Sequence, residues 1–459
     1  MTSYLSARRW HLWIEYAFVV AIVAGISYVA WFYHENGYLP QPFFYEPGGV
    51  FMDWFSLSPY GYFRGAYDVN GSIYPPLSFV IMRIFSLPRC YHINSAEWAR
   101  DCDWGGVAGL TGFIATNAVL TFVAFYKQDR ATFLPRAFAM SFGLPMIYTY
   151  ERGNILLLAY TFILLAFGPP LIRSARVRWF FGGLALNLKV YLIGAVLAPL
   201  LQRRWIQTEG IILWAAGIYL ATYAFLGEGS PAEIFGNVTY YASGYAASNP
   251  LDLWYASSMV PVITLLSGEN FPISSYMSSD TVNIILMVAT TVARTTQILI
   301  VLSAAAIWIR PEVVPRHRGV FLAIAMAVTT SEVGGYTQIL LLMFIFMERW
   351  QGIAKPLAIV MAYALCIPAE YVMGTEVYLT RFSWLHGSDV YAHYGLGLMA
   401  LLRPLIAMLI VWCIASTTIY DVWVDIRHQG WKKRWRFRND LPIMVGAGEA
   451  KPLSGSTER

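Results

Sequence analysis

The chain has 459 residues, of which 57% are hydrophobic and only 13% are charged, and its formal net charge is +5. Soluble domains usually have about 25% charged residues, so this composition excludes an ordinary water-soluble fold and predicts a protein that faces lipid. The tail "RHQGWKKRWRFR" follows the last apolar segment. In that position it is better explained as an anchor at the membrane surface than as a site for nucleic acid.

The first apolar segment, residues 11–33, is too long for the apolar core of a cleaved signal peptide and predicts a retained membrane helix. Residues 34–105 follow, are rich in aromatic, glycine and acidic residues, and are expected to form the first outer loop. Cys90 and Cys102 lie in this loop and could form a disulfide in an oxidising compartment. The next apolar segment, 106–126, approaches the roughly 20 residues that a membrane crossing needs.

Three later regions are flanked by arginines at both ends and are too short for two ordinary crossings. Only about 24 residues separate Arg178 from Arg203, whereas two crossings need about 40. Because basic turns collect on the cytoplasmic side, we predict that residues 178–203 enter the membrane, break near Asn187 and Lys189, and return. A single kinked crossing is the alternative. The same pattern predicts broken hairpins over 137–172, interrupted by "YERGN", and over 319–348, interrupted by "SEVGGY".

The remaining apolar segments complete the expected fold. They cover residues 210–226, 282–309, 356–372 and 394–417, and they are separated by outer loops at 227–281 and 373–393. We expect an all-α polytopic membrane protein: one domain over 1–420 with roughly 11–13 transmembrane or broken helices, and short interfacial helices in its outer loops. Both termini, including a basic and partly disordered tail over 421–459, are expected in the cytoplasm.

The predicted hairpin breaks place ionisable residues inside the bundle, namely Arg152, Lys189 and Glu332. Buried charges in a membrane are expensive and usually functional. The alternative is that they pair with one another, for example Lys189 with Glu332, and only hold the helices together. Charged hairpin tips therefore predict either a polar site or a structural ion pair.

The outer loops supply further candidates for chemistry. Asp53 lies among aromatic residues just after the first helix, and this setting suits a general base, although it also suits a helix cap. Arginine matches the geometry of phosphate, so Arg381 is a candidate phosphate contact together with His386, whose alternative role is structural. Aromatic residues could form a carbohydrate surface or an ordinary interface belt. The candidates for acceptor or sugar binding are Arg64, Asp68, Tyr74, Tyr240, Trp254, Glu332 and Tyr336. No spacing of Cys or His predicts a metal site or a cofactor.

A long first outer loop with Asp53, then "RGN" opening a helix, then "GGLALNLK" and "RRW", resembles the GT-C superfamily of membrane glycosyltransferases. Over residues 10–360 the chain is most similar to glycosyltransferase family 87, the polyprenyl-phosphate-mannose-dependent mannosyltransferases. The resemblance implies an inverting, metal-independent transfer of a sugar, mannose in this family, from a polyprenyl-phosphate donor to a hydroxyl of a glycolipid or glycan acceptor.

In residue terms, the resemblance implies that Asp53 is the catalytic base and that Arg152 and Lys189 contact the donor phosphate. Family members often carry a histidine motif where this chain reads "SEVGGYTQIL", with Tyr336 and Gln338 in its place. A third phosphate contact and the sugar are therefore not assigned. The implied location is a bacterial inner membrane, with the site facing the periplasm or outside.

Two other classes of protein fit parts of the pattern. Broken helices with buried charges also occur in transporters, and a flippase for a lipid-linked glycan is one alternative. Transporters tend to show paired halves, whereas this chain has one large asymmetric loop and no internal repeat. An O-antigen-type polymerase is the other alternative, and its basic residues would be expected in larger outer loops.

Overall fold

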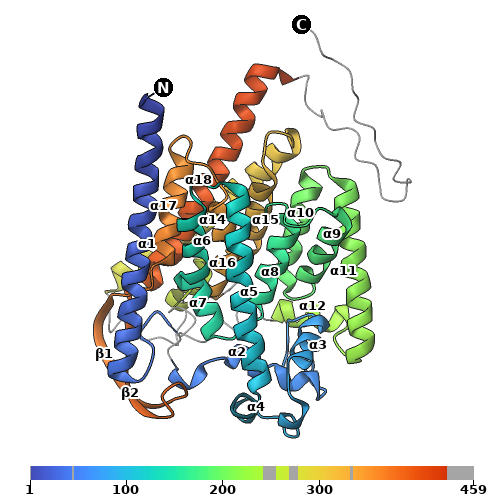
Figure 1. The fold of residues 1–459 in the computed structure, drawn as a ribbon, viewed down its shortest axis with the longest axis vertical. Coiled ribbons are helices and arrows are strands. Elements are labelled where there is room, and N and C mark those ends of the chain that lie inside the picture. Colours follow the sequence, from blue (N-terminus) through green and yellow to red (C-terminus); the bar gives the residue numbers. More distant parts are fainter. Residues whose placement is uncertain (1, 44–45, 241–254, 268–277, 331–333, 432–459) are drawn as a thin grey trace.

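The computed structural model describes residues 2–43, 46–240, 255–267, 278–330 and 334–431, and Figure 1 shows them as a bundle of roughly aligned helices. Among these residues, five helices are long and apolar enough to cross a membrane by length and composition. They are α1 (Thr2–Asn36), α5 (Trp104–Gln128), α11 (Trp205–Leu226), α14 (Ser279–Ile309) and α18 (Leu398–Gln429). The helical, membrane-type architecture expected from composition is thus present.

Shorter helices lie between the long ones and run along the bundle and back (Figure 1). Each of the three predicted breaks separates two of these helices. The first set is α6 (Phe133–Phe142), α7 (Leu144–Glu151) and α8 (Leu156–Phe167). The second is α9 (Ala175–Leu186), η4 (Val190–Ile193) and α10 (Gly194–Leu201). The third is α15 (Arg316–Thr330), η9 (Gly335–Thr337) and α16 (Gln338–Ile345), and α17 (Ala354–Cys366) follows. The break between α6 and α7 at Gly143 is a further one that the sequence does not predict.

The second set returns to the end of the bundle from which it starts. Arg173 and Arg178, before and at the start of the hairpin, line the same small cavity as Arg204 and Gln207, which follow it. Residues 178–203 therefore begin and end together. The segment turns back within the bundle as predicted and does not run through it once. That it does so inside a membrane, with both ends in the cytoplasm, stays a prediction.

Side-chain hydrogen bonds within the protein stabilise the broken backbone at the tip of this hairpin. The Asn187 side-chain amide donates to the carbonyl oxygen of Gly183 at 2.9 Å and to that of Ala215 in α11 at 3.0 Å. Broken backbone within a bundle survives only where protein groups or water take up its hydrogen bonds. Asn187 thus closes α9 and ties the turn to the neighbouring long helix.

Short helices cover the end of the bundle opposite to the start of α1, as expected for outer loops. The first outer segment contains η1 (Pro47–Gly49), α2 (Met52–Phe55), η2 (Ser58–Gly61), α3 (Pro76–Ile84), η3 (Pro88–Cys90) and α4 (Ala96–Cys102). Cys90 and Cys102 form a disulfide with their Cα atoms 5.6 Å apart. Between α11 and α14 lie α12 (Pro231–Tyr240) and α13 (Val260–Ser267).

The expected loop at 373–393 is instead an antiparallel β-hairpin of β1 (Val372–Ser383) and β2 (Ser388–Gly397). Its sequence, "VYLTRFS" and "DVYAHYG", is rich in aromatic and β-branched residues, which favour paired strands. The hairpin packs on the end of α1, where the Ser383 hydroxyl donates to the Gly37 carbonyl oxygen at 2.6 Å. This β-hairpin is a local exception to the expected all-α architecture, which the other described elements follow.

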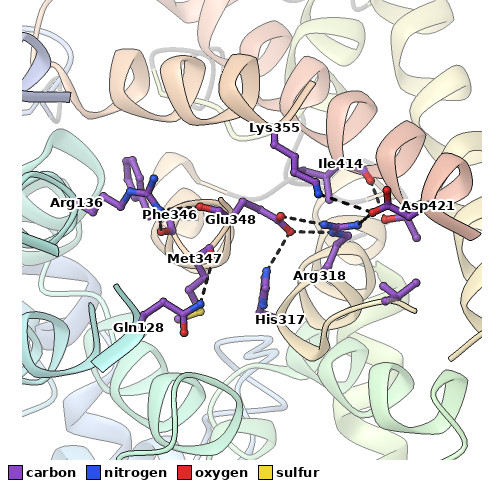
Figure 2. Close-up of polar contacts among 12 residues, drawn as sticks. Gln128, Arg136, His317, Arg318, Phe346, Met347, Glu348, Lys355, Ile414 and Asp421 are labelled. Atoms are coloured by element: carbon purple, nitrogen blue, oxygen red, sulfur yellow. Dashed lines mark hydrogen bonds and ion pairs between the residues drawn. The ribbon is translucent and has the colours of Figure 1, made fainter. Parts of the chain in front are cut away.

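At the opposite end, where α1 begins and α18 ends, buried ion pairs join the helices (Figure 2). Arg318 in α15 binds both carboxylate oxygens of Glu348, at 2.8 and 2.9 Å, and Asp421 in α18 at 2.8 Å. His317 lies 3.0 Å from Glu348. Burial opposes ionisation of Glu348, but hydrogen bonds and charges from His317 and Arg318 outweigh burial and hold its pKa well below the usual range. Because Asp421 lies in α18, which extends to Gln429, the first part of the expected tail is helical; residues 432–459 lie outside the described residues.

We expect Glu348→Gln to lower the thermal midpoint of unfolding clearly. The substitution leaves the buried Arg318 guanidinium without its bidentate partner, and breaking a buried pair typically costs about 3–5 kcal/mol. Thermal unfolding of the purified protein in detergent, followed by tryptophan fluorescence, measures the change. Glu35→Gln is the matched control. It removes a carboxylate whose side chain is 55% exposed. Equal shifts for the two variants would contradict a structural role for this network.

Candidate functional site

Asp53 lies where the first outer segment meets the turn after α7. The backbone N–H of Phe51 donates to the Glu151 carbonyl oxygen at 2.8 Å, and that of Asp53 donates to the Arg152 carbonyl oxygen at 3.0 Å. Gly153 adopts φ +65°, and a Cβ there would lie 2.9 Å from the Phe51 Cα. Only glycine permits both this backbone conformation and this close approach.

The same turn holds the Asp53 carboxylate by both oxygens. The Arg152 guanidinium forms an ion pair with Oδ1. The Asn154 amide donates to Oδ2 at 2.7 Å. The side chains of Asp53 and Arg152 remain 17% and 12% exposed, so the carboxylate is fixed in direction but is still reachable.

Lys189 reaches this region from the tip of the second hairpin. It is an extended residue between α9 and η4, and only 6% of it is exposed. Its ammonium donates to the Tyr74 hydroxyl at 2.6 Å and lies 4.1 Å from the centroid of the Tyr74 ring and 5.6 Å from that of Tyr336. Ser78 in α3 donates to the Leu188 carbonyl oxygen at 3.0 Å, which docks the outer segment on the hairpin tip.

Asp53 and Lys189 lie in one region of the molecule. Lys189 lies next to Tyr336, Tyr336 is stacked on Tyr148, and Tyr148 lies in α7 just before Arg152, the partner of Asp53. The two charges are within electrostatic range of each other. The segments that bring them together come from the first outer loop, the first hairpin and the second hairpin. Tyr336 belongs to the third hairpin and contacts Lys189, so this hairpin also reaches the site. The polar tips of all three hairpins therefore converge.

Three tyrosines line this convergence. The ring of Tyr148 lies edge-on to Tyr255, with centroids 4.5 Å apart, and is stacked on Tyr336 at 6.2 Å. The backbone N–H of Gly335 donates to the Tyr255 carbonyl oxygen at 2.7 Å, and a Cβ on Gly335 would collide with the Tyr255 ring. The guanidinium of Arg403 in α18 lies 5.2 Å from the centroid of Tyr255. The tyrosines thus form an aromatic wall between cations.

The two predicted phosphate contacts of the β-hairpin have other partners. Arg381 forms an ion pair with Glu46 at 3.3 Å, and its side chain is 43% exposed. The His386 ring nitrogen Nδ1 lies 2.7 Å from the Ser388 hydroxyl. The hairpin still touches the segment before Asp53, because the Trp384 ring meets Phe51 with centroids 5.5 Å apart. A role for Arg381 and His386 in phosphate binding stays a prediction.

The other predicted acceptor residues lie farther out or cannot be placed. Arg64 and Asp68 are exposed, and Asp68 accepts a hydrogen bond from the backbone N–H of Val69 at 2.9 Å. Tyr240 ends α12 and is 57% exposed. Trp254 and Glu332 lie outside the described residues. The proposed pair of Lys189 with Glu332 is therefore untested.

Sequence reasoning missed two residues of the site, Asn154 and Tyr148. Asn154 stands in the "RGN" motif, two residues after Arg152, so its position in the break was a usable signal. Tyr148 is one of 30 tyrosines in the chain, and nothing in the sequence separates it from interface residues. Tyr255 belongs to the aromatic cluster that the sequence offers as a carbohydrate surface or an interface belt.

We expect Gly153→Ala to lower the unfolding midpoint and to displace Asp53 from its partners. A side chain at positive φ costs about 1–2 kcal/mol, and here it also meets the Phe51 backbone. Thermal unfolding measures the first effect. Gly112→Ala on α5 is the control, because a Cβ there meets nothing within 4 Å and alanine favours a helix. An unchanged midpoint for Gly153→Ala would contradict the tight contact.

No protein-family model, curated protein or solved structure matches the chain. Among the residues that the structure describes, no group of three or more His, Cys, Asp or Glu side chains could hold a metal ion. The site itself presents a carboxylate held by two partners, a buried ammonium and an aromatic wall.

Proposed function

We propose that the protein is an inverting membrane glycosyltransferase of the GT-C type. It moves a sugar from a polyprenyl-phosphate donor to a hydroxyl of a glycolipid or glycan at the outer face, and mannose is the sugar that the resemblance implies. The observation that carries the proposal is the meeting of Asp53 and Lys189 in one site, although they come from separate outer and hairpin segments. The site thus contains a proton acceptor and, within electrostatic range of it, an anion-binding group.

Asp53 acts as the general base. Each carboxylate oxygen already accepts one hydrogen bond, from Arg152 or from Asn154, but a carboxylate has about four acceptor positions. A free position can receive the proton of the acceptor hydroxyl as its oxygen attacks the anomeric carbon. Because Arg152 is committed to Asp53, we assign it to positioning the base rather than to the donor phosphate.

Lys189 acts on the other side of the transferred sugar. When the new glycosidic bond forms, the bond between the anomeric carbon and the phosphate oxygen breaks, and its electron pair leaves with the polyprenyl phosphate. The negative charge on that phosphate grows during this step. A buried ammonium already oriented by Tyr74 stabilises such a charge without reorganisation.

The aromatic wall gives the site a surface for the sugar. Ligand sites are lined mainly by apolar and aromatic groups with a few placed polar groups. Tyr336 and Tyr148 are stacked next to Lys189, so a sugar leaving the phosphate would lie against their rings. We therefore assign Tyr336 and Tyr74 to the donor side of the site.

The arrangement of charge favours an outward-facing site. Basic turns gather at the end of the bundle where α1 begins, and this side is cytoplasmic by the positive-inside rule. Asp53 and the disulfide lie at the other end, which would face the periplasm or its equivalent. A bacterial inner membrane is the location that fits both features.

Asp53→Asn should reduce transfer by at least about 100-fold, because general base catalysis contributes about 10²–10⁴-fold. The assay incubates purified protein with short-chain polyprenyl-phosphate sugars, mannose first, and measures the release of bare polyprenyl phosphate. Glu97→Gln changes an exposed carboxylate of the same segment to which no role is assigned, and it should keep most activity. Near-normal turnover of folded Asp53→Asn would remove the assignment of the base.

Lys189→Met should reduce turnover by about 100-fold or more, a typical loss for one charge-stabilising donor. Tyr74→Phe keeps the ring and removes the hydroxyl that receives the Lys189 hydrogen bond, so it should have an intermediate effect. The same release assay, with the unfolding midpoint as a folding check, compares the two variants. A folded Lys189→Met protein with normal turnover would contradict the role in leaving-group stabilisation.

A further inference from the structure

A second charged site lies at the opposite end of the second hairpin from Lys189. It is a cavity of about 250 Å³. Eight residues line it: Arg173, Ala175, Arg178, Trp179, Arg204, Ile206, Gln207 and Arg316. They come from the entry to the hairpin, from its exit and from the start of α15. The proposed glycosyl transfer uses none of them.

Four of the lining residues are arginines, and no lining residue is acidic. Arg178 is held in place, because its guanidinium donates to the carbonyl oxygens of Ala166 at 3.0 Å and Gly168 at 3.2 Å. Arg178 and Arg316 are close enough to repel each other electrostatically. The cavity therefore gathers four guanidinium groups, with no carboxylate among its lining residues.

Three helix N-termini meet at the same cavity. Ala175 is the first residue of α9, Ile206 and Gln207 lie in the first turn of α11, and Arg316 begins α15. The N-terminus of a helix carries a partial positive charge and unpaired N–H groups, which favour phosphate. These dipoles reinforce the arginines, so the cavity has the chemistry of a phosphate site.

One side of the cavity is apolar and continues onto a lipid-type surface. Trp179 and Ile206 line it, and Ile212 and Leu213 farther along α11 are 50% and 52% exposed. Tryptophan is enriched at the headgroup level of membranes. An acyl chain could lie along α11 while a headgroup enters the cavity.

We propose that this cavity binds the phosphate of an anionic phospholipid in the leaflet at this end of the bundle. The bound phosphate bridges the entry and exit of the second hairpin, because Arg173 and Arg178 precede the break and Arg204 follows it. The lipid thereby holds together the two ends of the segment whose tip carries Lys189.

The test uses the full chain purified in a neutral detergent. Native mass spectrometry and thermal unfolding are recorded with added phosphatidylglycerol, with phosphatidylcholine, or with inorganic phosphate alone. We expect retained phosphatidylglycerol and a raised midpoint, with little effect of phosphatidylcholine or inorganic phosphate. If inorganic phosphate stabilises as strongly as the lipid, the assignment to a lipid is overturned.

The double variant Arg173→Gln/Arg316→Gln should weaken phosphatidylglycerol binding by at least about tenfold, because it removes two of the four guanidinium groups that line the cavity. Both arginines are exposed, so the fold should tolerate the change. Lys127→Gln/Arg130→Gln removes the same charge at another exposed turn and is the control. Equal losses in the two double variants would show non-specific attraction and overturn the proposal.

Discussion

The structure depends on one constraint: polar hairpin tips inside an apolar bundle must find partners within the protein. Each of the three interrupted helix pairs is too short to cross twice, and each turns back with polar groups at its tip. No water shell is available in such a bundle to satisfy exposed backbone and charge. The tips therefore meet one another and the first outer segment, and this meeting brings Asp53, Arg152 and Lys189 together.

The two ends of the second hairpin have complementary chemistry. Its tip presents one buried ammonium to a carboxylate-containing site, whereas its base gathers four arginines and three helix N-termini. In the proposed mechanism, Lys189 at the tip binds the phosphate of the polyprenyl donor as it leaves the sugar. At the base, the proposed phospholipid keeps its phosphate bound between the arginines. In these proposals the positive charge of the chain would serve both the orientation of the protein and its binding of lipid phosphate.

Much of this arrangement could be predicted from the sequence because arginine spacing and apolar length are strong local signals. The interval between Arg178 and Arg203 predicted a returning hairpin with Lys189 at its tip, and the structure has it. The ion pair between Arg152 and Asp53 could not be predicted. It depends on backbone hydrogen bonds between the segment that carries Asp53 and the turn at Gly153. The β-hairpin over 372–397 was missed because its mixture of aromatic, β-branched and polar residues is also typical of a loop at the membrane interface.

Labelling from the two sides of the membrane tests the returning hairpin most directly. Arg176→Cys, Trp205→Cys and Asn70→Cys are placed singly in a Cys366→Ala/Cys413→Ala background, and oriented vesicles are treated with a membrane-impermeant thiol reagent. The structure predicts that positions 176 and 205 react from the same side and position 70 from the other. Labelling of 176 and 205 from opposite sides would contradict the hairpin and separate Lys189 from Asp53.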